Sequence, residues 1–268
     1  MSTFGLVSYG ATAVGFALLT VLLATSWQGR QMGARLIAAS GMTALWAALL
    51  ALHSLVGRMP AILVYGAEIL RDAGWLFVLT GLAAASAPRW LRVGAHALWG
   101  GLLAWGLVGP LLLRGTLGPT VYESWLVRGG LLLSVTALVL LEQVYRNASP
   151  TGRKALRYLV IGLGAVLVYD LFLYSLAEVT PGLSADIWNA RGLVNLFAMP
   201  LIALAVRRNP EWSLDIFVSR QVVFYTTTCM AAGAYLAIIA LGGYAVRELG
   251  GRWGTIGQIL FFSGAGIA

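Results

Sequence analysis

Three charged residues interrupt the third long apolar run of the chain: Glu68, Arg71 and Asp72. Spacings of three and four residues place Glu68 on the same helical face as both others, so the trio can pair in part and carries one surplus negative charge. An unpaired charge at the centre of a membrane helix costs roughly 2.5 to 3.5 kcal/mol, so we expect these side chains to face a bundle interior and find partners there.

Two interpretations of this trio remain open. It can form a polar site within the bundle that senses a proton, an ion or a ligand. Alternatively, the third span starts later, so that the trio lies on an interfacial helix end and its side chains extend into water.

Asp170 is the other deep charge, with Tyr169 beside it and Tyr174 one helical turn further on. A buried carboxylate at this position can be neutral and hydrogen-bonded to a hydroxyl, or paired with Arg71 across the bundle. Asp170 also fits a helix contact that only fixes packing. The seventh apolar run carries Asn195 and Pro200, which suit either packing or the kinked polar helix of a transporter binding site.

No catalytic or metal-binding motif accompanies these residues. His53 and His96 are isolated, whereas a zinc or heme site needs further ligands at recognisable spacing. The sequence contains no zinc-protease, nucleophile-elbow or phosphate-loop motif. A single cysteine, Cys229, excludes an internal disulfide and a thiolate cluster. The residues therefore predict neither catalytic nor metal-ligating side chains.

The composition places these polar residues in a membrane protein. Of 268 residues, 59% are hydrophobic and 10% are charged, against roughly a quarter charged in ordinary soluble domains. The net charge of +8 comes from basic residues in short segments between apolar runs, which predicts contact with the lipid bilayer and not with nucleic acid.

The elements that must position the charges are long apolar helices. A hydrocarbon core of about 30 Å takes about 20 helical residues, and spanning backbone must satisfy its hydrogen bonds within each helix. The sequence predicts an all-α, polytopic transmembrane helix bundle of about nine spans in one domain, residues 1–268. The predicted spans are 4–26, 36–55, 61–84, 93–113, 126–141, 158–176, 188–206 and 222–246, with an incomplete ninth from Thr255 to Ala268.

The ends of the spans predict an orientation and a longer native chain. Alternate loops starting with the first hold eleven basic residues and the remaining loops hold six, which predicts an N-terminus outside the cell. The ninth run reaches only about 21 Å. We therefore expect the native protein to continue beyond Ala268.

Four runs in the second half resemble one family: residues 141–147 (LEQVYRN), 169–175 (YDLFLYS), 191–195 (RGLVN) and 208–220 (RNPEWSLDIFVSR). They resemble the membrane-embedded N-terminal region of PrsK-type sensor histidine kinases, which are associated with bacterial exosortase/PEP-CTERM protein sorting and exopolysaccharide systems. The resemblance covers roughly residues 140–260, and the first half shares only its hydropathy.

The resemblance implies a two-component sensor in the bacterial inner membrane. A GAF domain, a phosphoacceptor helix and a kinase domain using ATP and Mg²⁺ would follow the last span, with a cognate response regulator as partner and a homodimer as a possible assembly. None of these domains lies in the 268 residues. His53 and His96 lie in or beside apolar spans and do not match the phosphoacceptor.

The segment 207–220 is a candidate cytoplasmic coupling loop, with Arg208, Trp212, Asp215 and Arg220 linking the seventh and eighth spans. It fits equally a loop that only fixes topology. The leading hypothesis is a sensory and anchoring region that regulates a cytoplasmic kinase. The alternative is a multi-pass transporter or lipid-linked-saccharide enzyme, with Glu68, Arg71, Asp72 and Asp170 along its path.

Overall fold

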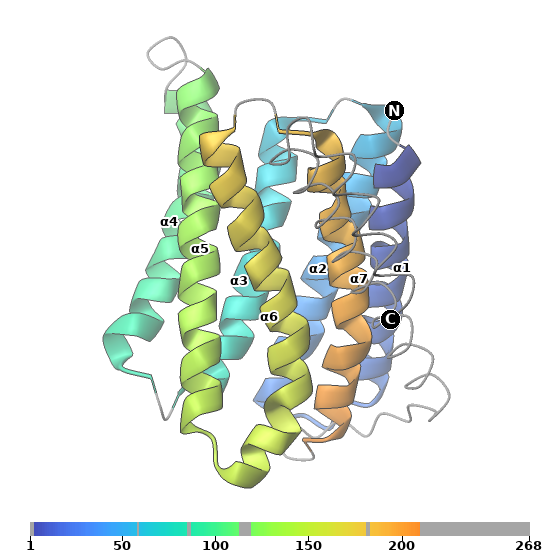
Figure 1. Ribbon diagram of the computed structural model, residues 1–268, viewed down its shortest axis with the longest axis vertical. Coiled ribbons are helices and arrows are strands. Elements are labelled where there is room, and N and C mark those ends of the chain that lie inside the picture. Colours follow the sequence, from blue (N-terminus) through green and yellow to red (C-terminus); the bar gives the residue numbers. More distant parts are fainter. Residues whose placement is uncertain (1–2, 58, 85–86, 113–118, 181–182, 210–268) are drawn as a thin grey trace, which may run out of the picture. The chain divides into compact units, whose positions relative to one another are not determined.

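The computed structural model describes residues 3–57, 59–84, 87–112, 119–180 and 183–209. Seven α-helices make up the regular structure of this part (Figure 1), which confirms the all-α prediction there. They are α1 (Thr3–Thr25), α2 (Gln31–Val56), α3 (Ala61–Leu82), α4 (Arg89–Leu112), α5 (Pro119–Asn147), α6 (Pro150–Val179) and α7 (Ala185–Arg207).

Each of the first seven predicted spans overlaps one of these helices, and the eighth and ninth lie outside the described residues. Six of the seven helices are long and apolar enough to cross a membrane, which indicates a multi-pass membrane protein. The exception, α3, has 22 residues but carries the three charges Glu68, Arg71 and Asp72.

The helices extend further into polar sequence than predicted. α2 begins at Gln31, and α5 and α6 absorb almost all of the polar stretch 142–157, leaving a two-residue connection. The hydroxyl of Ser149 accepts a hydrogen bond from the backbone N–H of Gly152 at 3.1 Å, and Pro150 occupies the first helical turn. Both features favour the start of a helix. They explain why α6 begins at Pro150, in residues that hydropathy alone assigns to a loop.

Six helices contact one another in a closed ring, in the order α1, α2, α3, α5, α6, α7 and back to α1. α4 packs outside this ring against α3 and α5 (Figure 1). Successive helices run in opposite directions. One end of the bundle therefore holds the start of α1 and the α2–α3 connection at Met59, and the other holds the start of α4. We name them the Met59 end and the Arg89 end.

Polar contacts join α1 to α7 near the Met59 end. Ser8 Oγ donates to the carbonyl of Asn189 at 2.6 Å, and Thr12 Oγ1 donates to the carbonyl of Gly192 at 2.6 Å. The backbones are so close that a Cβ at Gly192 would lie 2.8 Å from the backbone carbon of Ser8. Small residues and hydroxyls are typical of helix contacts in membranes. This contact fixes α7 and thereby positions Arg191.

Candidate functional site: a buried charge network

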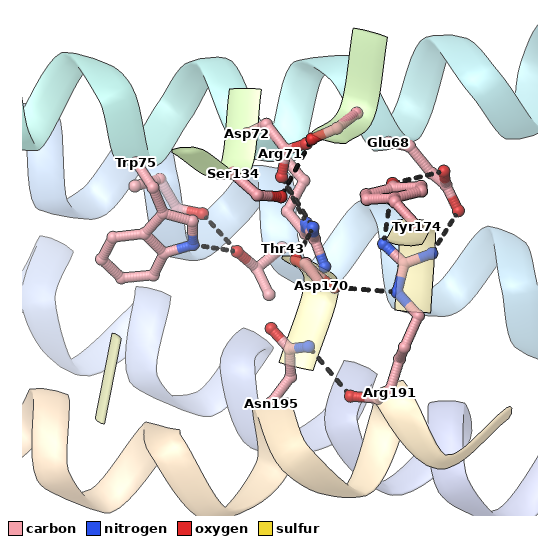
Figure 2. A network of polar contacts seen from close by, with 12 residues as sticks. Thr43, Glu68, Arg71, Asp72, Trp75, Ser134, Asp170, Tyr174, Arg191 and Asn195 are labelled. Carbon is pink, nitrogen blue, oxygen red and sulfur yellow. Dashed lines mark hydrogen bonds and ion pairs between the residues drawn. The ribbon is translucent and has the colours of Figure 1, made fainter. Parts of the chain in front are cut away.

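Charged and polar side chains from three helices meet inside the ring (Figure 2). α3 supplies Glu68, Arg71 and Asp72, α6 supplies Asp170 and Tyr174, and α7 supplies Arg191 and Asn195. Glu68 and Asp72 have side chains that are 13% and 12% exposed, respectively. Because α3 runs from Ala61 to Leu82, the trio lies in the middle of this helix.

Asp170 bridges the two arginines of the network. Its Oδ2 accepts a short hydrogen bond from Nη2 of Arg71, and its Oδ1 accepts from Nε of Arg191 at 3.1 Å. Asp170 is 2% exposed, Arg71 1% and Arg191 0%. Asp170 is therefore paired with Arg71 across the bundle, which is one of the states that the sequence allows. Arg71 also donates to Asp72 Oδ1 from Nε at 3.0 Å and from Nη2 at 2.6 Å.

Glu68 pairs with Arg191 of α7. Arg191 Nη1 donates to Glu68 Oε1 at 2.8 Å, while the hydroxyl of Tyr174 donates to Glu68 Oε2 at 3.2 Å. Nη2 of Arg191 donates to the Tyr174 hydroxyl at 3.3 Å, which closes a small ring of hydrogen bonds. Within the predicted trio, the internal pair is therefore Arg71 with Asp72, and Glu68 is satisfied from α6 and α7.

The formal charge of the whole network is −1 when every group is ionised, from three carboxylates and two guanidinium groups. Pairing offsets the large cost of removing each charge from water only while every partner is present, because removal of one partner leaves another charge buried and uncompensated. The network therefore couples α3, α6 and α7 strongly, and its surplus charge favours a proton or a cation.

Aromatic rings line the two buried arginines. The guanidinium carbon of Arg71 lies 4.4 Å from the ring centroid of Trp46, and that of Arg191 lies 5.3 Å from the same ring. Arg191 also lies 5.6 Å from the ring of Trp188. Cation–π contacts of this kind are strongest where water is excluded. Trp46 is 0% exposed and makes an edge contact with Tyr9 at 5.4 Å between centroids.

Arg191 and Trp46 are two members of the site that the sequence analysis missed. The charge count in the sequence analysis includes Arg191 among the six basic residues of the remaining loops, although it lies inside the seventh predicted span and is fully buried in α7. Its position within that apolar run was the available signal. Trp46 carries no such signal, because an aromatic residue in an apolar run is ordinary core.

Asn195 lies one turn after Arg191 and supports the helix that carries it. Its side-chain amide donates to the carbonyl of Arg191 at 2.9 Å, and Asn195 is 2% exposed. This hydrogen bond lies within α7. The predicted neighbour of Asp170, Tyr169, donates from its hydroxyl to the carbonyl of Ile187 at 2.7 Å and so ties α6 to α7.

An open cavity of about 560 Å³ reaches the network from the Met59 end. Its lining includes Glu68, Tyr174, Trp188, Tyr9 and His53. Pockets of about 300 to 1,000 Å³ hold small ligands. A second space of about 20 Å³ lies beyond it, and Glu68 and Tyr174 line both, whereas Asp72 lines only the inner one. A solute in the outer cavity can therefore contact the carboxylate of Glu68 and the hydroxyl of Tyr174.

Of the predicted coupling residues, the structure describes Arg208, and Trp212, Asp215 and Arg220 lie outside the described residues. Arg208 caps the C-terminus of α7, with its guanidinium carbon 4.6 Å from the ring centroid of Tyr158 on α6. The side-chain amide of Asn209 donates to the carbonyls of Ala205 at 2.7 Å and Ala155 at 3.3 Å. The end of α7 is thus joined to the start of α6.

No protein-family model, curated protein or solved structure matches this chain. Within the described ranges, no group of histidine, cysteine, aspartate and glutamate side chains is arranged to hold a metal ion. His53 lines the outer cavity, and His96 is on α4, where its Nδ1 accepts from Trp99 Nε1 at 3.1 Å.

Proposed function

We propose that this chain is the membrane-embedded sensory and anchoring region of a two-component sensor histidine kinase, and that its buried charge network reads a proton or a small ligand. The observation that carries the sensory role is the open cavity of about 560 Å³ that ends on Glu68 and Tyr174, both of which bond to Arg191. The link to a kinase rests on the resemblance of residues 140–260 to PrsK-type sensors.

The distribution of basic residues supports an orientation with the N-terminus outside, in the bacterial inner membrane. The cavity at the Met59 end would then open to the outer side, and the Arg89 end would face the cytoplasm. The basic residues of the described helices and their caps at the Arg89 end are Arg30, Arg35, Arg89, Arg92, Arg146, Arg153, Lys154, Arg157, Arg207 and Arg208.

A cue can act through this network by favouring one of two helix arrangements. Protonation of Glu68, or binding of a cationic solute to it, would weaken its ion pair with Arg191. Arg191 also bonds Asp170, so the loss changes how α7 is held against α3 and α6. A ligand shifts such an equilibrium only by its difference in affinity for the two states. α7 leads into the segment 208–220, the proposed coupling loop.

The kinase proposal is tested by reading the gene beyond codon 268 and by assaying ATP-dependent phosphorylation. We expect codons for a phosphoacceptor helix and an ATP-binding domain, and Mg²⁺-dependent transfer from ATP to the protein and then to its response regulator. A stop codon directly after Ala268, or a full-length protein that incorporates no phosphate, would reject it.

The sensory role is tested in membrane vesicles that contain the full-length protein. Glu68→Gln and Arg191→Gln should each change the phosphorylation level by at least about fivefold, a typical coupling between two sites. Arg128→Gln removes the same charge as Arg191→Gln from a side chain that is 54% exposed and paired with Glu178, and it should leave phosphorylation unchanged. Unchanged phosphorylation in correctly folded Glu68 and Arg191 variants would show that the network does not regulate the kinase.

A transporter or lipid-linked-saccharide enzyme is the second candidate, with Glu68, Arg71, Asp72 and Asp170 along its path. The observation that favours it is the pair of successive spaces that share Glu68, because a conducted ion needs more than one polar position. Proteoliposomes that contain a pH-sensitive dye test the proton-transport form. Proton flux that is lost in Glu68→Gln, in a protein that incorporates no phosphate from ATP, would favour transport over signalling.

A further inference from the structure

A second cavity, of about 550 Å³, lies at the Arg89 end, far along the bundle from the mouth of the first. It is lined by the start of α2, the end of α3 and the start of α4. Three arginines line it, Arg35 from α2 and Arg89 and Arg92 from α4, together with His96 and Thr80. The proposed sensory function does not use any of these residues.

The charge of this cavity is not balanced by the described protein. None of the lining residues is acidic, and among the residues that the structure describes no carboxylate forms an ion pair with Arg35, Arg89 or Arg92. Three guanidinium groups around one space repel one another unless an anion lies between them. The cavity therefore favours a negatively charged occupant.

Several hydrogen-bond donors are available to such an anion. Nε of Arg92 is buried and none of the described groups accepts from it. Because Nδ1 of His96 accepts from Trp99, a neutral His96 carries its proton on Nε2 and can donate there.

Arg35 Nη1 donates to the carbonyl of Phe77 at 3.2 Å, which holds that guanidinium group against the end of α3. Arg89 starts α4, where the helix dipole adds positive potential.

Positive residues at the inner face of a membrane protein are common, so the arrangement matters more than the number of charges. At the same end, Arg146 is 73% exposed and pairs with Glu142, and Arg157 is exposed and donates to Tyr158. Neither lines this cavity. Arg35, Arg89 and Arg92 differ because two helices, α2 and α4, bring them and His96 to one cavity.

We propose that this cavity is a binding site for a phosphate group. Guanidinium groups bind phosphate oxygens through paired N–H donors, and several arginines around one anion are the usual arrangement for a tetrahedral oxyanion. The phosphate can belong to the headgroup of an anionic phospholipid or to a water-soluble phosphate compound. The two sources share the same contacts and differ in whether acyl chains are required.

The test uses the full chain purified in detergent, with two probes and matched variants. Titration calorimetry measures binding of inorganic phosphate, and native mass spectrometry after exchange into phosphatidylglycerol or phosphatidylcholine measures retained lipid. The cavity variant is Arg89→Gln/Arg92→Gln. The control, Arg146→Gln/Arg157→Gln, removes two charges from exposed side chains at the same end.

We expect the native chain and the control to bind at least one probe, and the cavity variant to bind it at least tenfold more weakly. Retention of phosphatidylglycerol without binding of inorganic phosphate identifies a lipid headgroup as the source, and binding of inorganic phosphate identifies a soluble ligand. Binding of neither probe by the native chain, or an equal loss in the cavity and control variants, overturns the proposal.

A second variant keeps the test decisive if Arg89→Gln/Arg92→Gln fails to fold. Val93 is 56% exposed and lines the cavity, so its replacement leaves the core intact. Val93→Glu places a carboxylate beside the arginines and should weaken probe binding at least tenfold, whereas Val93→Gln should bind like the native chain. Equal binding by the glutamate and glutamine variants overturns the proposal.

Discussion

The described residues include two groups of arginines in opposite environments, one buried and one lining an open cavity. Arg71 and Arg191 are buried at the centre of the ring, and three carboxylates and several aromatic rings surround them. Arg35, Arg89 and Arg92 surround an open cavity at the Arg89 end, where the described residues offer them no carboxylate. The same side chain is therefore a fixed structural partner in one region and an available binding group in the other.

The difference follows from access to solvent and ligands. A guanidinium group inside the bundle has to be satisfied by the fold itself, because an unpaired buried charge is very costly. At the end of a helix, water or a soluble anion can satisfy it. Substitutions should therefore affect stability strongly in the first group, and ligand binding more than stability in the second.

The largest expected effect comes from Asp170, the carboxylate that both buried arginines share. Asp170→Ala should destabilise the protein by about 3 to 5 kcal/mol, because it leaves two buried charges short of a partner. Equilibrium unfolding in detergent measures this loss. Glu178→Gln, which breaks the exposed pair with Arg128, is the control and should leave the stability nearly unchanged. Equal losses in the two variants would contradict the distinction between buried and exposed pairs.

The next effect comes from Glu68. Glu68→Gln removes the charge that Arg191 contacts at 2.8 Å, and a charge-assisted hydrogen bond contributes about 1.5 to 3 kcal/mol. The same unfolding measurement should give a loss in this range. In a double-mutant cycle with Arg191→Gln, the two losses should not be additive. Additive losses would show that the side chains do not interact in solution.

A somewhat smaller loss is expected where α1 approaches α7. Gly192→Ala adds a Cβ that would lie 2.8 Å from the backbone carbon of Ser8, so the helix that carries Arg191 must shift. Overpacking of this kind costs about 1 to 3 kcal/mol. Gly94→Ala on α4 is the control, because its Cβ would meet nothing within 4 Å. That alanine should stabilise its helix slightly, and destabilisation by both would point to a general glycine effect.

The smallest effect is expected at the cavity of the Arg89 end. In phosphate-free buffer, Arg89→Gln should change the stability by no more than about 0.5 kcal/mol, as is usual for exposed side chains. Thermal unfolding of Arg89→Gln beside Arg191→Gln makes the comparison direct, since both lose one guanidinium group. Equal destabilisation would mean that Arg89 has a structural carboxylate partner and would remove the contrast between the two groups.

The pairing of Arg71 with Asp170 could be anticipated from the sequence because charges within membrane helices seek partners. The first seven helices were also predictable, since long apolar runs set their number and approximate place. Arg191 was missed because it was counted with loop cations, although it lies within an apolar run with Asn195 one turn later.

Other parts of the site depend on tertiary contacts that one sequence does not display. Trp46 contacts both arginines only because the fold brings this part of α2 close to α3 and α7. The approach of Gly192 to Ser8 joins residues far apart in the chain. The ends of α2, α5 and α6 were misplaced because their polar turns lower the hydropathy, and at the start of α6 the Ser149 cap favours helix in such a turn.

Two hydrogen bonds join α6 to α7 at well-separated positions along the helices, one from Tyr169 to Ile187 and one from Asn209 to Ala155. Sliding of one helix along the other by a full turn, about 5.4 Å, would break both hydrogen bonds. Tilting the two helices together as one hairpin, or rotating them as a pair, leaves both intact. Piston-like motion between α6 and α7 is therefore disfavoured, and a change in the position of α7 would move α6 with it.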